Sequence, residues 1–267
     1  MPCPICTADS WIPVLITESF AIVRCTTCTL ARTMPAPAES DGREHFAEDY
    51  DHYKRFYAEQ RELRYDFAAR MLHMVRAFKA AGRVLDIGCG LGFFLDCART
   101  HGYQCVGIDT SVAAARFARE QLRLNVIASD FMDAQFSASE AFDVVTANHV
   151  LEHISLPIPF LDKARRLLKP GGILVSASPN FGGLLPRLLG RRWYGLQPAQ
   201  HVWQFTPDSY RALFQKAGFR VERTRIDSMH YAPGTNWKAN LVFCLAKLAT
   251  GIGHGDNLVI VARRAER

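Results

Sequence analysis

Short apolar runs alternate with helical stripes along most of this chain, and the alternation predicts an α/β protein. Residues 84–87 and 142–147 are short, largely apolar runs, as expected of parallel strands buried on both faces of a sheet. Residues 103–111 predict another strand. A helical stretch reaches residue 81, and its apolar positions follow helical spacing, which predicts core packing: Phe67, Met71, Val75 and Phe78.

The second half of the chain continues this alternation. Residues 160–168 are helical in pattern, and residues 169–180 contain a Pro-Gly-Gly turn followed by a fifth strand. The last strand is predicted over residues 257–262. With 267 residues, of which 49% are hydrophobic, the chain is large enough to bury a full core.

A glycine-rich turn follows the first of these buried strands. Residues 84–95 read VLDIGCGLGFFL, with glycine at alternate positions. Glycine has no Cβ and tolerates positive φ, so the backbone of such a turn can pass close to a ligand. The dinucleotide fingerprint G-x-G-x-x-G needs a third glycine where this chain has Phe93, which weakens a pyrophosphate-binding interpretation.

An acidic residue follows this turn at an informative distance. Asp109 ends the next predicted strand and lies nineteen residues after Gly90. A βαβ unit places a ribose-binding carboxylate roughly 20 residues after its glycine loop. The loop and the acid together predict a nucleoside-containing cofactor.

The glycine turn resembles the D-x-G-x-G-x-G motif of class I S-adenosylmethionine (SAM) methyltransferases, and the resemblance extends over roughly residues 60–267. It implies a Rossmann-like seven-stranded sheet and SAM as the cofactor. It also implies that Asp109 holds the ribose hydroxyls, that Asp130 meets the adenine amine and that Phe131 covers the ring. The cofactor-binding residues expected from it are Asp86, Gly88, Cys89, Gly90, Gly92, Asp109, Thr110, Asp130, Phe131 and Asn148.

Two Cys-x-x-Cys pairs lie in the first thirty residues, and their spacing matches a four-thiolate zinc ribbon: Cys3, Cys6, Cys25 and Cys28. Four thiolates leave no open position for a catalytic water, so the Zn²⁺ is expected to be structural. Disulfides are the alternative, but without a secretory signal the cytosol would keep the thiols reduced. The remaining cysteines are expected to be small core residues: Cys89, Cys97, Cys105 and Cys244.

The resulting domain prediction has three parts. A zinc ribbon covers residues 1–33, a Pro/Ala/Ser-rich linker with a lid segment covers 34–58, and the methyltransferase domain covers 59–267 with an acceptor-site insertion at about 181–205. In SAM methyltransferases such an amino-terminal helix often covers the cofactor. Tyr53 or Tyr57 is therefore a candidate to approach the methionine carboxylate.

The insertion contains a basic amphipathic stretch at residues 184–196, with leucines, arginines and Trp193. One interpretation is a helix that caps the active site; the other is contact with a membrane interface or an anionic acceptor. Further along, His201 begins an H-x-x-x-F-T element. That element resembles zinc-headed methyltransferases of cell-envelope sugar, lipid and natural-product pathways.

Charge and hydropathy limit the partners of the protein. The net charge is +6, but acidic and basic residues are interspersed, which does not form a nucleic-acid stripe. Residues 241–252 form the most apolar segment, yet about twelve residues are too few to span a bilayer. We therefore predict a cytoplasmic protein. A second form of this prediction adds peripheral contact with the inner face of the membrane.

Three histidines are candidates to remove a proton from an acceptor: His149, His153 and His201. Imidazole titrates near neutrality and can accept a hydroxyl proton. His149 follows a buried strand at its carboxyl end, and His201 begins the H-x-x-x-F-T element. These two are the predicted catalytic residues. Glu152 and His153 are predicted instead to cap and pair at the start of the following helix.

The predicted function is methyl transfer from SAM to a small-molecule, saccharide or lipid-linked acceptor, at oxygen. Three alternatives stay open: carbon methylation of a nucleotide sugar, RNA methylation, and a scaffold that binds SAM without turnover. Base-modifying RNA enzymes usually carry N/D-P-P-[FY], whereas residues 148–151 read NHVL, which argues against adenine or cytosine N-methylation. Acceptor identity and oligomeric state do not follow from the sequence.

Overall fold

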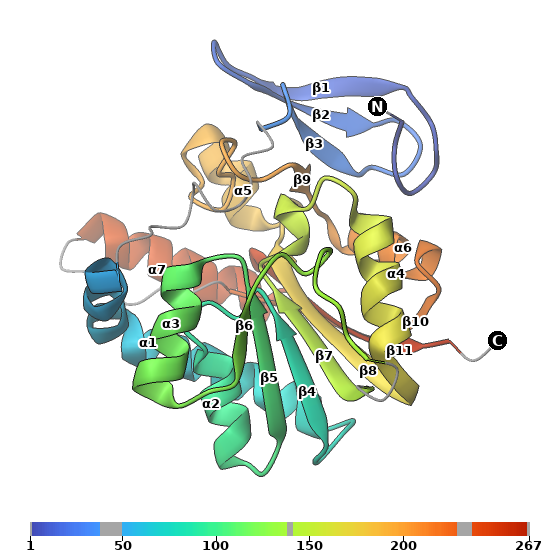
Figure 1. The fold of residues 1–267 in the computed structure, drawn as a ribbon. Coiled ribbons are helices and arrows are strands. Elements are labelled where there is room, and N and C mark those ends of the chain that lie inside the picture. The colour runs from blue at the N-terminus through green and yellow to red at the C-terminus, as the bar shows by residue number, and fades with distance from the viewer. Residues whose placement is uncertain (1, 38–49, 138–140, 229–236, 266–267) are drawn as a thin grey trace. The chain divides into compact units, whose positions relative to one another are not determined.

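A computed structural model describes residues 2–37, 50–137, 141–228 and 237–265. It contains two sheets (Figure 1): a four-stranded sheet of order β1-β2-β3-β9 and a seven-stranded sheet of order β10-β11-β8-β7-β4-β5-β6. The seven-stranded α/β architecture predicted from the sequence is confirmed. The chain divides into two compact units that interleave along the sequence. Unit 1 comprises 1–38, 149–161 and 177–260, and unit 2 comprises 39–148, 162–176 and 261–267.

Unit 2 contains the parallel part of the large sheet. Its strands are β4 (Arg83–Ile87), β5 (Gln104–Asp109), β6 (Val126–Ala128) and β7 (Phe142–Asn148). β4 pairs in parallel with β5 on one side and with β7 on the other, so the strand order changes direction at β4. Ligands of open α/β sheets bind outside the carboxyl ends of the strands at such a switch point.

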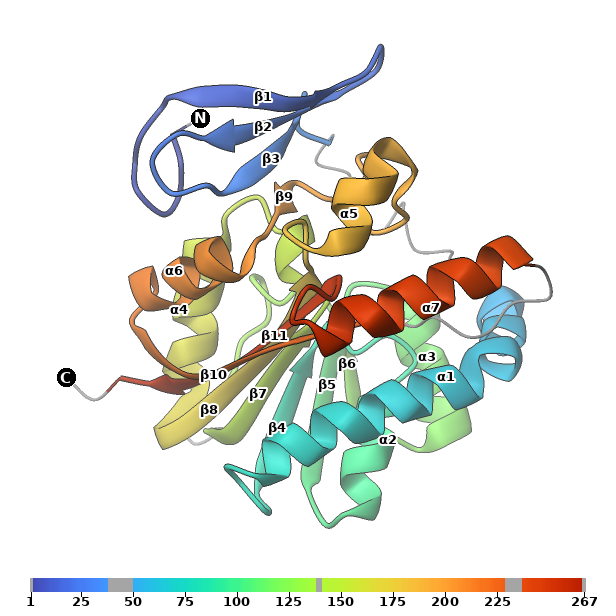
Figure 2. The ribbon, with the colours of Figure 1, turned by 180° about the vertical axis from the view of Figure 1, so that it is seen from behind.

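Three helices of unit 2 pack together beside these strands, as Figure 2 shows: α1 (Tyr50–Arg76), α2 (Phe93–Thr100) and α3 (Val112–Leu122). The first turns of α1 supply aromatic rings to a cluster around Phe117. The ring of Tyr57 stacks on that of Phe93, with centroids 5.2 Å apart. The start of α1 therefore lies over the loop that follows β4.

Unit 1 begins with a cysteine-rich hairpin structure. Its strands are β1 (Trp11–Ile16), β2 (Ala21–Cys25) and β3 (Ala31–Met34), paired antiparallel in that order. β3 also pairs with β9 (Trp203–Gln204). The Thr33 hydroxyl donates to the His201 carbonyl oxygen at 2.6 Å, and the Thr33 amide donates to that of Val202 at 3.0 Å. The amino-terminal strands thus hold the 201–204 segment directly.

The amino-terminal strands share a small core with later segments of unit 1, formed by Ile22, Ala31, Leu185, Trp193, Leu196 and Ala246. The other elements that lie within unit 1 are η1 (Leu151–His153), α5 (Leu184–Leu189), η2 (Gly190–Arg192), α6 (Pro207–Lys216), β10 (Phe219–Asp227) and α7 (Trp237–Gly251). Of these, η1 and η2 are short 3₁₀ turns. Two strands, β8 (Leu168–Pro179) and β11 (Asn257–Arg264), and the helix α4 (Pro157–Leu167) run through both units.

Several local predictions were wrong. The helix expected to reach residue 81 ends at Arg76, and the chain leaves it through a turn in which the amides of Phe78 and Lys79 both donate to the Val75 carbonyl oxygen, at 3.0 and 2.9 Å. The Pro-Gly-Gly turn lies inside β8, where the Arg263 guanidinium donates to the Gly171 carbonyl oxygen at 2.8 Å. Cys244 is exposed, so it is not a core residue.

Other predictions differ in detail. Glu152 and His153 lie in the separate turn η1, and α4 begins four residues later. Residues 38–49 of the expected linker lie outside the described residues. Within the described part of the chain, no helix has the length and apolar character needed to cross a bilayer.

Candidate functional site

The glycine loop joins β4 to α2 in unit 2. The amides of Gly88 and Cys89 both donate to the carbonyl oxygen of Ile108, at 2.8 and 3.2 Å, which fixes the loop to the end of β5. Cys89 turns its thiol into the fold, and burial raises the pKa of that thiol well above its usual range. The Cys89 side chain is therefore a neutral packing group, and only its backbone belongs to the loop surface.

Two glycines of this loop have different neighbours. A Cβ on Gly92 (φ +85°) would lie 2.4 Å from Leu124 Cδ1, so the fold itself requires glycine there. A Cβ on Gly90 (φ +53°) would meet no atom within 4 Å. The space above Gly90 is thus open on the side where a bound molecule would lie.

Two carboxylates lie beside the loop. Asp109 Oδ2 accepts from the Gly90 amide at 2.7 Å, and its Oδ1 accepts from the Ser111 amide at 2.9 Å. Asp86 is buried and accepts from the Thr146 hydroxyl at 2.6 Å. Burial raises the pKa of Asp86 to about 7, the Thr146 hydrogen bond opposes this rise, and the nearby charge of Asp109 adds to it.

Other expected cofactor residues take up places around this loop. Thr110 lies between Asp109 and the amino-terminal cap of α3, and the hydroxyl of Tyr53 lies 3.2 Å from the Ser111 Oγ. Asn148 ends β7, and its Oδ1 is a buried acceptor without a hydrogen-bond partner among the described residues. A buried acceptor of this kind is suited to bind a donor from a ligand.

The turn after β6 is held by a residue that the sequence did not single out. Asp130 is exposed and accepts from the Met132 amide, whereas Phe131 is buried. Lys163 Nζ donates to the carbonyl oxygens of Phe131, Met132 and Ala134 at 2.6 to 2.9 Å and lies 5.0 Å from the Phe131 ring centroid. A lysine thirty residues away carries no local sequence signal for this role.

In unit 1 the structure groups four polar residues around Glu152. His149 Nδ1 lies 3.2 Å from Glu152 Oε1, and the Ser178 hydroxyl donates to Glu152 Oε2 at 3.1 Å. Burial raises the pKa of Glu152, but the His149 hydrogen bond and the charges of the neighbouring histidines outweigh it and lower the pKa to about 2. Glu152 is therefore a buried carboxylate, and His149 donates to it from Nδ1.

The other two histidines, His153 and His201, also lie close to Glu152. The rings of His153 and His201 are edge to face, with centroids 4.7 Å apart. Burial lowers the pKa of His201 to about 4, partly offset by the charge of Glu152. The prediction that Glu152 and His153 cap and pair at a helix start did not include His201, which a distant segment supplies.

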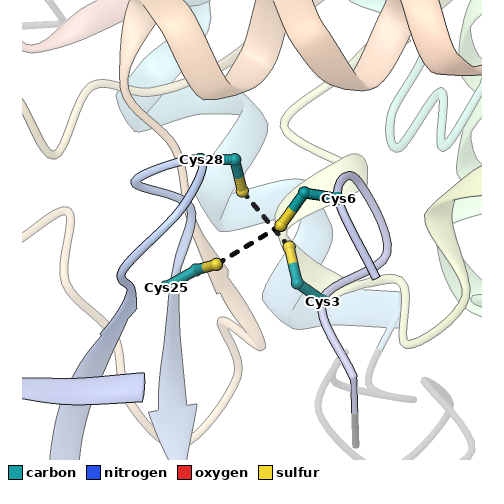
Figure 3. A group of neighbouring side chains, drawn as sticks. All are labelled: Cys3, Cys6, Cys25 and Cys28. Atoms are coloured by element: carbon teal, nitrogen blue, oxygen red, sulfur yellow. Dashed lines mark hydrogen bonds between the residues drawn. The ribbon is translucent and has the colours of Figure 1, made fainter. Parts of the chain in front are cut away.

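The four cysteines of the amino-terminal strands converge in unit 1, as Figure 3 shows, and their sulfurs all lie within 4.8 Å of one another. Each Cys-x-x-Cys turn is followed by a threonine in the left-handed region, Thr7 at φ 62° and Thr29 at φ 63°. The amides of these threonines donate to the carbonyl oxygens of Cys3 and Cys25. The two turns are therefore near-identical, and together they present four sulfurs to one point, an arrangement that can hold a metal ion.

The amphipathic stretch at 184–196 is partly internal. Leu185 and Trp193 are buried in the unit 1 core, and the Trp193 indole donates to Asp256 Oδ2 at 3.3 Å. Leu188 and Tyr194 are exposed. The stretch therefore uses part of its apolar surface for folding.

Comparison with known proteins agrees with this geometry. Residues 57–224 match a family described as "Methyltransferase domain". The chain is 30% identical over 186 residues to a protein of Nitrobacter winogradskyi named "Ubiquinone biosynthesis O-methyltransferase", covering 65% of this chain and 68% of that protein. A protein of Cereibacter sphaeroides with the same name is 32% identical over 51% of this chain and 59% of its own length.

A solved complex that contains the Haloferax volcanii Trm112 methyltransferase activator has a similar fold. The TM-score is 0.65 at 18% identity, and the alignment covers 82% of this chain and 97% of the matched chain. At that identity the similarity concerns the fold alone.

Proposed function

This chain belongs to the SAM-dependent methyltransferase family, and on that premise we propose that it transfers the methyl group to an oxygen atom of a small-molecule acceptor. The observation that carries the proposal is the pair of His149 and Glu152, a histidine oriented by a buried carboxylate at the end of a parallel strand. The names of the curated relatives support the choice of oxygen.

The donor would lie against the loop after β4. The open space at Gly90 fits a ligand in close contact with the backbone, and Asp109 would bind the ribose hydroxyls. Asn148 Oδ1 offers an acceptor to the amino group of the methionine part. The turn of Asp130 and Phe131, fixed by Lys163, would hold the adenine. Gly88, Cys89, Gly92 and Thr110 would complete the site through backbone positions.

SAM binding is expected to release a proton from Asp86. Because burial raises the pKa of Asp86 to about 7, much of this carboxyl is protonated near neutral pH, and a positively charged ligand favours the ionised form. The affinity should therefore rise with pH by up to about tenfold per unit below pH 7 and level off above it. Calorimetry in two buffers of different ionisation enthalpy measures the released proton. Asp86→Asn should abolish the release; equal affinity at pH 5.5 and 8 would contradict the proposal.

The acceptor chemistry is assigned to His149. Its Nδ1 donates to Glu152, which puts the ring lone pair on Nε2 and orients it. The bound cofactor supplies the methyl group and leaves as S-adenosylhomocysteine. The acceptor oxygen gains the methyl group and loses its proton to His149 Nε2. Burial lowers the pKa of His201 to about 4, which disfavours proton uptake by its ring at neutral pH.

Replacing His149 with glutamine is expected to lower kcat by roughly 100-fold or more, the size of a general-base contribution. SAM affinity should stay unchanged, because the glycine loop is untouched. Single-turnover methyl transfer and calorimetry measure the two quantities. His73→Gln, on the exposed side of α1, is the control and should keep both values. A normal kcat in the His149→Gln protein would show that His149 is not the general base.

The acceptor class is tested by incubating the purified protein and SAM with separate pools of phenols, saccharides, lipids and RNA. Native mass spectrometry then follows S-adenosylhomocysteine. Turnover with a hydroxyl-containing pool, and a product heavier by one methylene, supports the proposal. SAM binding without turnover in any pool would favour a scaffold role.

For the amino-terminal strands we propose a structural zinc ribbon. Four converging sulfurs in two near-identical turns support it, and a closed four-thiolate site leaves no position for substrate. We keep the predicted divisions as part of this proposal: the ribbon at 1–33, the linker and lid segment at 34–58, of which 38–49 lie outside the described residues, and the methyltransferase domain at 59–267.

A further inference from the structure

Glu152, His153 and His201 form a second cluster of metal-ligating residues in unit 1. Each offers a ligand atom, and these atoms lie within 4.8 Å of one another. Glu152 and His201 are buried, with 1% and 3% exposure, and His153 is half-buried. The cluster contains two imidazoles and one carboxylate, a ligand set that holds divalent transition metals in other proteins.

The hydrogen bonds fix the tautomers of both rings. His201 Nδ1 lies 3.0 Å from the carbonyl oxygen of Gly195, and His153 Nδ1 lies 3.2 Å from that of Gln200. A carbonyl oxygen only accepts, so each Nδ1 carries the proton and each Nε2 carries a lone pair. Metal-binding histidines typically donate their other N–H to a carbonyl in this way.

The cluster brings three potential cation ligands together. The Glu152 carboxylate lies 3.2 Å from His149 Nδ1 and accepts from the Ser178 hydroxyl at 3.1 Å, and its ligand atom lies within 4.8 Å of one from each of His153 and His201. One carboxylate oxygen and one nitrogen from each of two imidazole rings therefore lie close together. The structure shows no hydrogen bond to either Nε2 among the residues it describes. A bound cation would compensate all three acceptors.

The residues around the cluster hold it in place. The Ser178 hydroxyl and His149 orient the carboxylate, and the Val202 amide donates to the Glu152 carbonyl oxygen at 2.8 Å. Thr33 donates to the carbonyl oxygen of His201. Such supporting hydrogen bonds are the arrangement that preorganises a metal site.

We propose that Glu152, His153 and His201 bind one divalent transition-metal ion at a site separate from the four-cysteine cluster. Three protein ligands leave coordination positions open, unlike four thiolates. The charge of such an ion would favour the deprotonated form of an acceptor hydroxyl whose proton His149 takes. This role rests on the proposed oxygen methylation, whereas the binding of the ion does not.

Cobalt titration of the holoprotein tests the site. The four-cysteine cluster is first filled with one equivalent of zinc per chain and the zinc content measured, since zinc binds thiolates more tightly than cobalt and an excess of zinc would also occupy the second site. Visible absorption during addition of Co²⁺ should show one further ion per chain, with d–d bands and without sulfur-to-cobalt charge transfer. Glu152→Gln and His201→Gln should each weaken this binding by at least about tenfold. His101→Gln, an exposed histidine of unit 2, is the control and should bind Co²⁺ normally.

The variants separate this inference from the proposed function. His149→Gln should still bind one Co²⁺ but should not methylate hydroxyls. If a buried substitution unfolds the protein, His153→Gln at the half-buried position gives the same test. Absence of a sulfur-free cobalt spectrum in the folded wild type, or full binding in the ligand variants, would overturn the metal site even if methyl transfer is observed. Co²⁺ binding without turnover on hydroxyl acceptors would contradict the proposed function alone.

Discussion

Gly90→Leu is expected to weaken SAM binding by at least about 100-fold while the protein remains folded. A Cβ at this position would meet no protein atom within 4 Å, so a side chain can leave the backbone here without an immediate clash. It would occupy the space assigned to the cofactor, and forced overpacking costs about 1–3 kcal/mol or more. The left-handed backbone at φ +53° adds a cost of about 1–2 kcal/mol to the folding free energy.

Gly102→Leu is a matched control for this substitution. Gly102 has φ +87°, its added Cβ would also meet no atom within 4 Å, and it lies in the exposed turn before β5. The two variants should lose similar stability in thermal unfolding, but only Gly90→Leu should lose calorimetric SAM affinity. Equal affinity in both would refute the placement of the cofactor over the loop.

Cys25→Ser is expected to remove one zinc per chain and to unfold the amino-terminal strands. Structural zinc contributes on the order of 10 kcal/mol to the folding of comparable small sites, about as much as the whole stability of a typical domain. Burial raises the pKa of Cys25, but the amides of Thr27 and Cys28 and the neighbouring thiols outweigh it and lower the pKa to about 7. A serine hydroxyl cannot replace a thiolate in this position.

The measurements are zinc content by elemental analysis and hydrogen exchange of β1, β2 and β3. Cys244→Ser is the control, because Cys244 is exposed and remote in sequence from the cluster. It should retain zinc and exchange protection. Unchanged zinc content in Cys25→Ser would show that the four sulfurs do not bind the metal together.

The features that the sequence predicted well are those whose residues are close together along the chain. The loop from Asp86 to Gly92 and the two Cys-x-x-Cys pairs each combine a local turn with a fixed spacing, so their geometry follows from a few residues. The distance from Gly90 to Asp109 is set by one βαβ unit. The structure joins these two residues through the hydrogen bond from the Gly90 amide.

The features that the sequence did not predict depend on distant contacts. The group around Glu152 needs His201, 49 residues later, and Ser178, which is contributed by β8. Lys163 binds the turn at Phe131 by reaching across thirty residues. The Pro-Gly-Gly sequence looked like a turn because its local propensity is strong, yet it lies within β8, where the Arg263 guanidinium donates to the Gly171 carbonyl oxygen. Tertiary hydrogen bonds decided each of these cases.

The pairing of β3 with β9 makes the cysteine-rich strands a mechanical support for a histidine almost 170 positions away. Thr33 holds the main chain on both sides of the peptide between His201 and Val202. Loss of the zinc proposed for the four-cysteine cluster should release this support and displace the main chain at His201, whereas the loop around Gly90 is held by other hydrogen bonds. If the four sulfurs bind zinc as proposed, chelation should therefore disorder the 201–204 segment while the glycine loop keeps its hydrogen bonds to the end of β5.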